Sequence, residues 1–113
     1  MATSKVVELA VLIREKTRSG EVRWEKTSNA RAFQTAFPKY AVQIVSPAAG
    51  MATLLVFNAQ GALIEELSWP AAVGAQLGPA LIDTFEMARR QALGVDNALD
   101  EILGDLKTRQ GKK

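Results

Sequence analysis

The segment between Tyr40 and Leu67 constrains the fold most strongly, because it holds three runs of alternating residues separated by two turn signals. A period of two is typical of β-strands that bury one face. Ser46–Gly50 is a turn signal, and Asn58–Gly61 is typical of a type I turn closed by a glycine in the left-handed conformation. We therefore expect an antiparallel sheet in this segment. Its strands are predicted at Tyr40–Ser46, Met51–Phe57 and Ala62–Leu67.

Two of these strands differ in the polarity of their faces. Met51–Phe57 is apolar on both faces, which is typical of a central strand or of a strand at a dimer interface. Ala62–Leu67 carries Glu65 and Glu66 on opposite faces, which suits an edge strand whose charges prevent further pairing. Because the central strands are apolar on both sides, the sequence leaves open which face of the sheet is covered.

The N-terminal residues predict a helix that is capped by Thr3 or Ser4 and ends near Ser19, with Gly20 in the position of a C-terminal glycine cap. One face of this helix is apolar at the spacing i, i+3, i+4 and i+7. Its residues are Val6, Leu9, Ala10 and Ile13. Three further residues widen the apolar face: Val7, Val11 and Leu12. This width indicates a helix covered on two sides, either by the C-terminal helices or by a second copy of the protein.

A fourth strand is expected at Glu21–Thr27, where apolar residues, Trp24 among them, alternate with charged and polar ones. The next segment, Ala30–Phe37, fits two interpretations. It forms either a short helical turn, with Phe33 and Phe37 at the spacing i, i+4, or a loop fixed by these two phenylalanines.

Two helices are expected after the sheet. The first begins near Leu77 or Gly78, because Pro79 is tolerated only in the first turn of a helix, and Gly94 closes it as a C-terminal cap. Asp96 is expected to cap the second helix. The apolar face of this second helix repeats at i, i+3, i+4 and i+7 through Leu99, Ile102, Leu103 and Leu106.

These elements predict the α+β class: an N-terminal helix, a four-stranded, mostly antiparallel sheet and two C-terminal helices on one face of the sheet. A chain of 113 residues fits one domain. We place this domain at residues 1–107 and expect residues 108–113 to form a basic, frayed tail.

The chain contains no cysteine and no histidine. It therefore has no thiolate nucleophile or disulfide, and it lacks the commonest general base and metal ligand. Carboxylates do recur four residues apart, at Asp96 and Asp100 and at Glu101 and Asp105, but we interpret them as a solvated acidic face at the start of a helix. We expect no enzymatic activity, no catalytic residues, no cofactor and no metal site.

The N-terminal apolar run, Leu9–Ile13, is too short and too closely flanked by charges for a signal peptide or a membrane span. We therefore expect a cytoplasmic protein of bacterial type with no membrane association.

The net charge of +2 arises from the C-terminal residues. Without the four positive charges of Lys107, Arg109, Lys112 and Lys113, the net charge of the rest becomes −2. A slightly acidic body disfavours nucleic acid as the partner. One alternative nevertheless remains, a small nucleic-acid or anion-binding protein, because the tail could act together with two adjacent arginines. Its candidate anion contacts are Arg89, Arg90, Lys107 and Arg109.

Most aromatic residues lie near the start and the end of the predicted sheet. This placement is typical of core packing, but it also allows a second alternative, a small-ligand pocket lined by Trp24, Trp69 and Tyr40. No glycine-rich phosphate-binding pattern accompanies these residues.

Two passages, Glu15–Thr27 (EKTRSGEVRWEKT) and Ala88–Leu103 (ARRQALGVDNALDEIL), resemble a loose set of small single-domain bacterial proteins that carry no assigned activity. Such proteins combine a helix and a tryptophan-bearing strand with a sheet and C-terminal helices. The resemblance covers about half of the chain. It implies the same fold and transfers no activity and no site residue.

The leading functional hypothesis is a non-enzymatic protein-interaction module that forms a homodimer or binds another protein. It rests on the wide apolar face of the first helix, on the strand with two apolar faces and on the absence of catalytic residue types. The candidate interaction surface comprises Val7, Val11, Leu12, Trp24 and Trp69.

Overall fold

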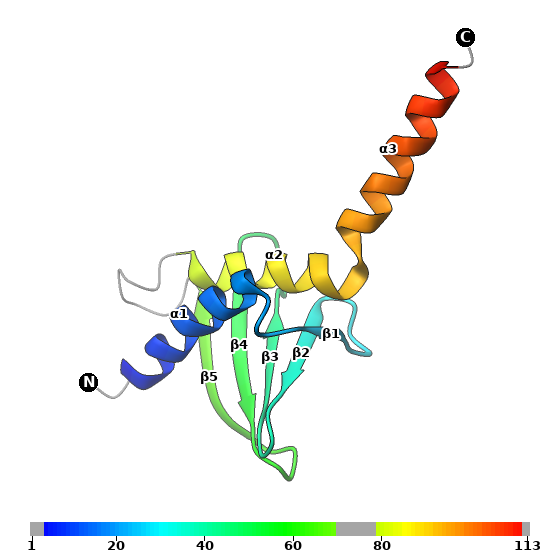
Figure 1. Cartoon of the computed structure of the whole chain (residues 1–113). Helices are drawn as coiled ribbons and strands as arrows, with labels where there is room; N and C mark the ends of the chain where they lie inside the picture. Colours follow the sequence, from blue (N-terminus) through cyan, green and yellow to red (C-terminus); the bar gives the residue numbers. More distant parts are fainter. Residues whose placement is uncertain (1–3, 70–78, 112–113) are drawn as a thin grey trace.

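The computed structural model describes residues 4–69 and 79–111 and shows a five-stranded antiparallel sheet with three helices (Figure 1). Helix α1 (Ser4–Ser19) precedes the strands, and helices α2 (Ala80–Leu93) and α3 (Val95–Gly111) follow them. The strand order is β1-β2-β3-β4-β5, so each strand pairs with its neighbours in sequence. The strands are β1 (Glu25–Lys26), β2 (Ala32–Ala36), β3 (Ala41–Val45), β4 (Ala52–Phe57) and β5 (Leu63–Trp69). The predicted α+β class is confirmed.

The fifth strand is β2, which corrects the prediction of a helical turn or a loop at Ala30–Phe37. Phe33 pairs with Ile44 and Thr35 pairs with Val42, so both β2 residues face the core side of the sheet. A spacing of four is shared by one face of a helix and one face of a strand, which is why the phenylalanine positions did not exclude a strand. In contrast, the strand expected at Glu21–Thr27 is reduced to the two residues of β1.

Helices α1 and α2 lie over the same face of the sheet (Figure 1). The predicted apolar face of α1 points into the core, where Ala10 and Ile13 are buried. Helix α2 contacts all five strands and contributes Leu81 and Phe85 to the same core. The sheet contributes, among others, Phe33, Val42, Ile44, Leu54 and Leu67. One continuous core therefore lies between the sheet and these two helices.

Two glycines adopt the left-handed conformation at positions where the chain must turn. Gly61 has a φ of 82° and closes the β4–β5 turn, in which the Asn58 side chain accepts hydrogen bonds from the Gln60 and Ala62 amides. This arrangement confirms the predicted turn. Gly94 has a φ of 63° and caps α2, as expected.

The start of α2 is described from Pro79, which occupies the N-cap position of the helix. The start that the sequence suggested near Leu77 or Gly78 lies outside the described residues. The predicted cap of the second C-terminal helix is wrong by two residues: α3 begins at Val95, so Gly94 precedes it and Asp96 lies within its first turn. Its carboxylate binds Arg90 instead, with Oδ1 2.8 Å from Nη2.

Helix α3 extends away from the body of the molecule, whose principal extents are 63 × 32 × 25 Å (Figure 1). Of the two C-terminal helices, α2 makes the contacts with the sheet, whereas residues 96–108 of α3 are all exposed. The helix continues to Gly111, past the predicted start of a frayed tail at Thr108. None of the helices in the described ranges is both long and apolar enough to cross a membrane.

Candidate interaction surface

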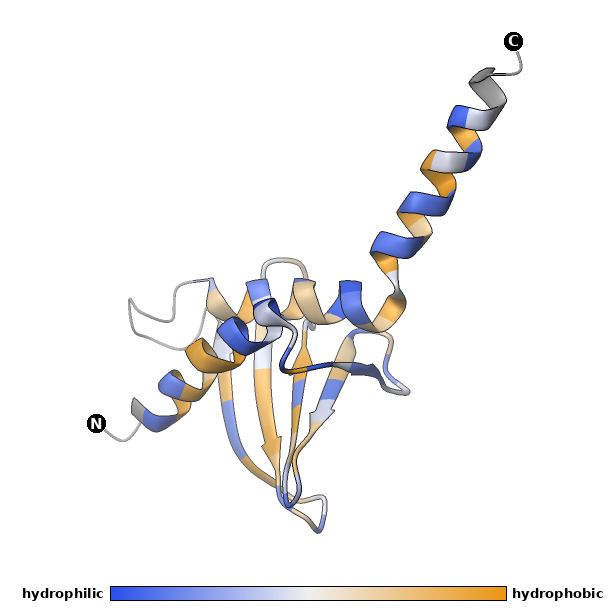
Figure 2. Cartoon of the chain, in the orientation of Figure 1, coloured by the Kyte–Doolittle hydropathy of each residue, from blue (hydrophilic) through white to orange (hydrophobic). Residues whose placement is uncertain are grey.

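The most prominent surface feature is an apolar stripe on the projecting helix α3. Its members are 44–54% exposed: Leu99, Ile102, Leu103 and Leu106. Residues at i, i+3, i+4 and i+7 share one face of a helix, so these side chains form a continuous strip. Figure 2 shows the apolar and hydrophilic residues of α3 on a helix that stands clear of the sheet. We call this strip the α3 stripe.

The α3 stripe has the same spacing as the buried face of α1, but its environment is the opposite. In α1 this spacing buries Val6, Ala10 and Ile13 against the sheet and α2. In α3 the junction at Gly94 directs the helix away from the core before the stripe begins. An apolar helix face of this kind normally packs against another surface.

The residues predicted as an interaction surface are separated by the structure. Val7 packs against the core and Val11 is half-buried, whereas Leu12 is exposed. Trp24 is only 4% exposed, so its ring is part of the core and is not available to a partner. The backbone of Trp69 belongs to β5, and its side chain lies outside the described part of the chain.

Burial of Trp24 also bears on the predicted aromatic pocket. Its indole Nε1 donates a hydrogen bond to Thr17 Oγ1 over 2.9 Å, inside the junction between α1, α2 and the sheet. Tyr40, by contrast, is half-exposed and precedes β3. Because the Trp24 ring is buried, it is not available to line an open pocket together with Tyr40.

The predicted anion contacts lie at two distant places. Arg89 donates to Glu86 Oε1 through Nη2 over 2.9 Å, and Arg90 donates to Asp96. Lys107 lies on α3, about 18 Å along the helix axis from its first residue. The side chain of Arg109 is outside the described part of the chain. Arg89 and Arg90 are each paired with a carboxylate on or next to their own helix, so they do not form a cluster with Lys107.

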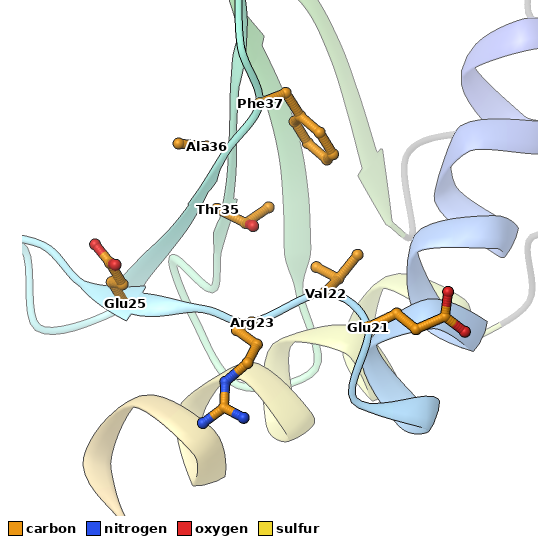
Figure 3. Close-up of a pocket in the computed structure, with 7 residues that line it drawn as sticks. All are labelled: Glu21, Val22, Arg23, Glu25, Thr35, Ala36 and Phe37. Carbon is orange, nitrogen blue, oxygen red and sulfur yellow. The ribbon is translucent and has the colours of Figure 1, made fainter.

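One shallow pocket lined by described residues has a volume of about 400 Å³ and lies between the segment before β1 and strand β2 (Figure 3). It is lined by Glu21, Val22, Arg23, Glu25, Thr35, Ala36 and Phe37. In Figure 3 the Arg23 side chain extends away from Thr35 and Phe37. A hydrogen bond from the Lys16 side chain, supported by one from Ser19, holds the pKa of Glu21 below its usual value. The polar groups of this pocket do not converge on one point.

Two further pockets lined by described residues have volumes of about 300 and 280 Å³. The first lies at the α1–α2–α3 junction and includes Thr17, Arg90 and Asp96, and the second includes Lys26, Asn29 and Leu93. Within residues 4–69 and 79–111, no group of three or more acidic side chains is arranged to hold a metal ion.

The sheet face opposite the two packed helices is the second extended surface. The strand register places Gln34, Gln43, Leu55 and Glu66 in one row across this face. The Gln43 amide donates to Gln34 Oε1 over 2.9 Å, which satisfies the centre of the row. Glu25 extends the row at the β1 edge, so both charged members of the row are acidic. Basic side chains that could bind phosphate are absent from this row of the described strands.

Sequence reasoning found the helix that carries the α3 stripe but did not place its residues in the interaction surface. The exposed position of Leu99 and Leu106 depends on the direction of α3 after Gly94, and the pattern of apolar residues carries no signal for that direction.

No family model matches the chain, and no curated protein and no solved structure matches it either.

Proposed function

We propose that this protein is a non-enzymatic interaction module that self-associates through the α3 stripe. The observation that carries the proposal is the exposure of Leu99, Ile102, Leu103 and Leu106 on a helix that leaves the body of the molecule. The cytoplasmic location and bacterial origin expected from the sequence belong to the same proposal.

The length and the sequence of α3 support the proposal that this helix packs against a partner. An isolated helix of about this length is marginally stable in water, and most helices gain their stability from packing an apolar face. Gly104 lies in the interior of α3 and weakens the helix by about 1 kcal/mol relative to alanine. Contact of the α3 stripe with a second surface supplies the missing packing and removes the exposed leucines from water.

The two alternative functions receive less support. An anion-binding protein needs free basic side chains, but Arg89 and Arg90 are engaged with Glu86 and Asp96. An aromatic pocket needs accessible rings, but Trp24 is buried in the core.

Solution mass tests the proposal directly. Light scattering coupled to size exclusion, at low and high salt, should give twice the mass of 12.2 kDa for the full chain at tens of micromolar. The double substitution Ile102→Gln and Leu106→Gln should weaken the dimer about 100- to 1,000-fold, because four half-exposed apolar side chains are lost from each interface and each contributes about 1 kcal/mol.

A matched control is available on β5. The double substitution Leu63→Gln and Ile64→Gln replaces one leucine and one isoleucine that are 48% and 51% exposed, close to the 47% and 54% of the α3 pair. This control should leave the mass unchanged. A monomeric full chain contradicts the proposal, and a dimer lost only in the β5 variant assigns the interface to the sheet instead.

A further inference from the structure

The spacing of the apolar residues in the α3 stripe is the same in both directions along the helix. Its spacings are three, one and three residues, and its midpoint falls between Ile102 and Leu103. A two-fold axis through this midpoint superimposes the stripe on itself with the helix direction reversed. Most dimers have two-fold symmetry, in which the same patch on each subunit must complement itself. The stripe meets this requirement for an antiparallel pair.

The charges of the C-terminal segment are divided at the same midpoint. Residues 95–102 contain three carboxylates and no basic residue, namely Asp96, Asp100 and Glu101. Residues 103–113 contain one carboxylate, Asp105, and four basic residues. The half before the midpoint is therefore acidic and the half after it is basic. Reversing the helix direction places each acidic half beside a basic half.

We propose that two copies of this chain pair through α3 in antiparallel orientation, with the two-fold axis between Ile102 and Leu103. The inference rests on the proposed self-association and adds the partner surface, the orientation and the register. Leu99 then packs against Leu106 of the partner subunit, and Ile102 packs against Leu103 of the partner subunit. The positive N-terminal end of each helix dipole also lies near the negative C-terminal end of the other.

Lys107 defines the electrostatic contact in this register. It lies seven residues after Asp100 and eleven after Asp96, which are close to two and three complete helical turns. Each aspartate is therefore within about 20° of Lys107 around α3, and the three side chains share one flank of the helix. The two-fold axis places this flank of both helices on the same side of the interface. Lys107 then falls between the partner's Asp96 and the partner's Asp100, about 3 Å from each along the helix axis.

The monomer leaves these groups accessible. Lys107 and Asp100 are exposed, and the Asp96 side chain is 75% exposed although it also accepts a hydrogen bond from Arg90. Exposed charge pairs contribute little affinity, so the α3 stripe provides the binding energy and the charges select the orientation.

Other occupants of the stripe fit the charges less well. A parallel pair puts Asp96, Asp100 and Glu101 of both copies at the same height, where like charges repel. The open sheet face of a second copy presents Glu25 and Glu66 to the acidic half of α3. An anionic lipid surface repels the same acidic half.

Disulfide trapping in the full chain tests the orientation. The native sequence has no cysteine, so the introduced thiols are the only ones present. Leu99→Cys and Leu106→Cys variants are oxidised separately and as a mixture, and mass spectrometry identifies the linked residues. In the antiparallel register a disulfide joins position 99 to position 106. Each variant alone remains unlinked, because its two thiols are about 10 Å apart along the helix axis, beyond the range of a disulfide.

Each outcome separates the orientation from the self-association. Linkage only in the mixture supports antiparallel pairing. Linkage of each variant with itself shows a parallel pair and overturns the inference while self-association stands. A dimer by light scattering without any linkage places the interface elsewhere and also overturns it. A monomer at tens of micromolar contradicts both the pairing and the proposed function.

Discussion

The indole Nε1 of Trp24 donates a hydrogen bond to Thr17 Oγ1 over 2.9 Å, and both residues are buried. Gln91 of α2 joins the same pair: its Oε1 accepts from the Trp24 amide over 3.1 Å, and its Nε2 donates to the Thr17 carbonyl over 3.3 Å. These bonds connect the end of α1, the segment before β1 and the last turns of α2. They therefore fix the part of the body from which α3 departs.

Replacing Thr17 by valine keeps the shape of the side chain but leaves the buried indole donor without a partner. We expect the free energy of unfolding to fall by about 1–3 kcal/mol, measured by urea denaturation. In a Trp24→Phe background the same substitution should cost less, because the indole donor is absent. Equal costs in the two backgrounds contradict a stabilising role for this bond.

Two glycines of the C-terminal helices should respond to alanine in opposite directions. Gly94 has a φ of 63°, which costs an L-residue about 1–2 kcal/mol, so Gly94→Ala should lower the free energy of unfolding. Gly104 is helical, and a Cβ at this position meets no atom within 4 Å. Gly104→Ala should therefore stabilise α3 by about 1 kcal/mol.

Circular dichroism at increasing temperature measures both effects, with each variant as the control for the other. Gly104 lies about 150° around the helix from the centre of the α3 stripe, so its substitution should also leave the solution mass unchanged. A change of mass in Gly104→Ala contradicts the proposed interface.

Glu21 should contribute a small, pH-dependent part of the stability. Its pKa is lowered from 4.5 by hydrogen bonds from Lys16 and Ser19 and by the charge of Lys16. A lowered folded-state pKa means that the contribution is complete above pH 4.5 and is lost as the pH falls through the lowered value. Because the group is exposed, the effect is small.

The substitution Glu21→Gln should reduce stability above pH 4.5 and have no effect at a pH below the lowered pKa. Urea midpoints on both sides of this range provide the measurement. A stability difference that persists unchanged in acid contradicts the role of the ionised carboxylate.

Most of the fold could be predicted from local patterns, because turn residues and burial act over short stretches. Gly61 closes its turn and Gly94 caps its helix as their positions indicate. The β2 strand was missed because Phe33 and Phe37 satisfy both helical and extended spacing, and pairing with β3 decides between them. Such pairing is a tertiary effect that a single segment does not encode.

The candidate surface was less predictable than the fold. The spacing of Ile13 in α1 and of Ile102 in α3 is equally amphipathic, yet the first side chain is buried and the second is 54% exposed. The difference arises from how α1 and α3 are positioned relative to the sheet. Likewise, the alternation of apolar and polar residues around Trp24 predicts that its side chain is buried. The alternation does not show whether a partner or the rest of the same chain buries that side chain.

Charge reversal along α3 should change the dimer in a way that only the antiparallel register explains. Lys107→Glu places a third carboxylate between the partner's Asp96 and the partner's Asp100, so it should weaken self-association about tenfold at low salt. The double substitution Asp96→Lys and Asp100→Lys should weaken it similarly. Mixing the two variants gives both position-107 contacts a complementary partner in the heterodimer, and combining all three substitutions in one chain does the same in a homodimer.

The combined variant should therefore dimerise close to the native affinity, measured by sedimentation equilibrium at low salt. Lys39→Glu provides a control of equal charge change, because Lys39 is exposed in the β2–β3 turn, away from α3. High salt should reduce the differences between the variants, since it screens exposed charges. If the triple variant remains as weak as Lys107→Glu, the acidic and basic flanks do not face each other, and the antiparallel register is wrong even where the α3 stripe still holds the dimer together.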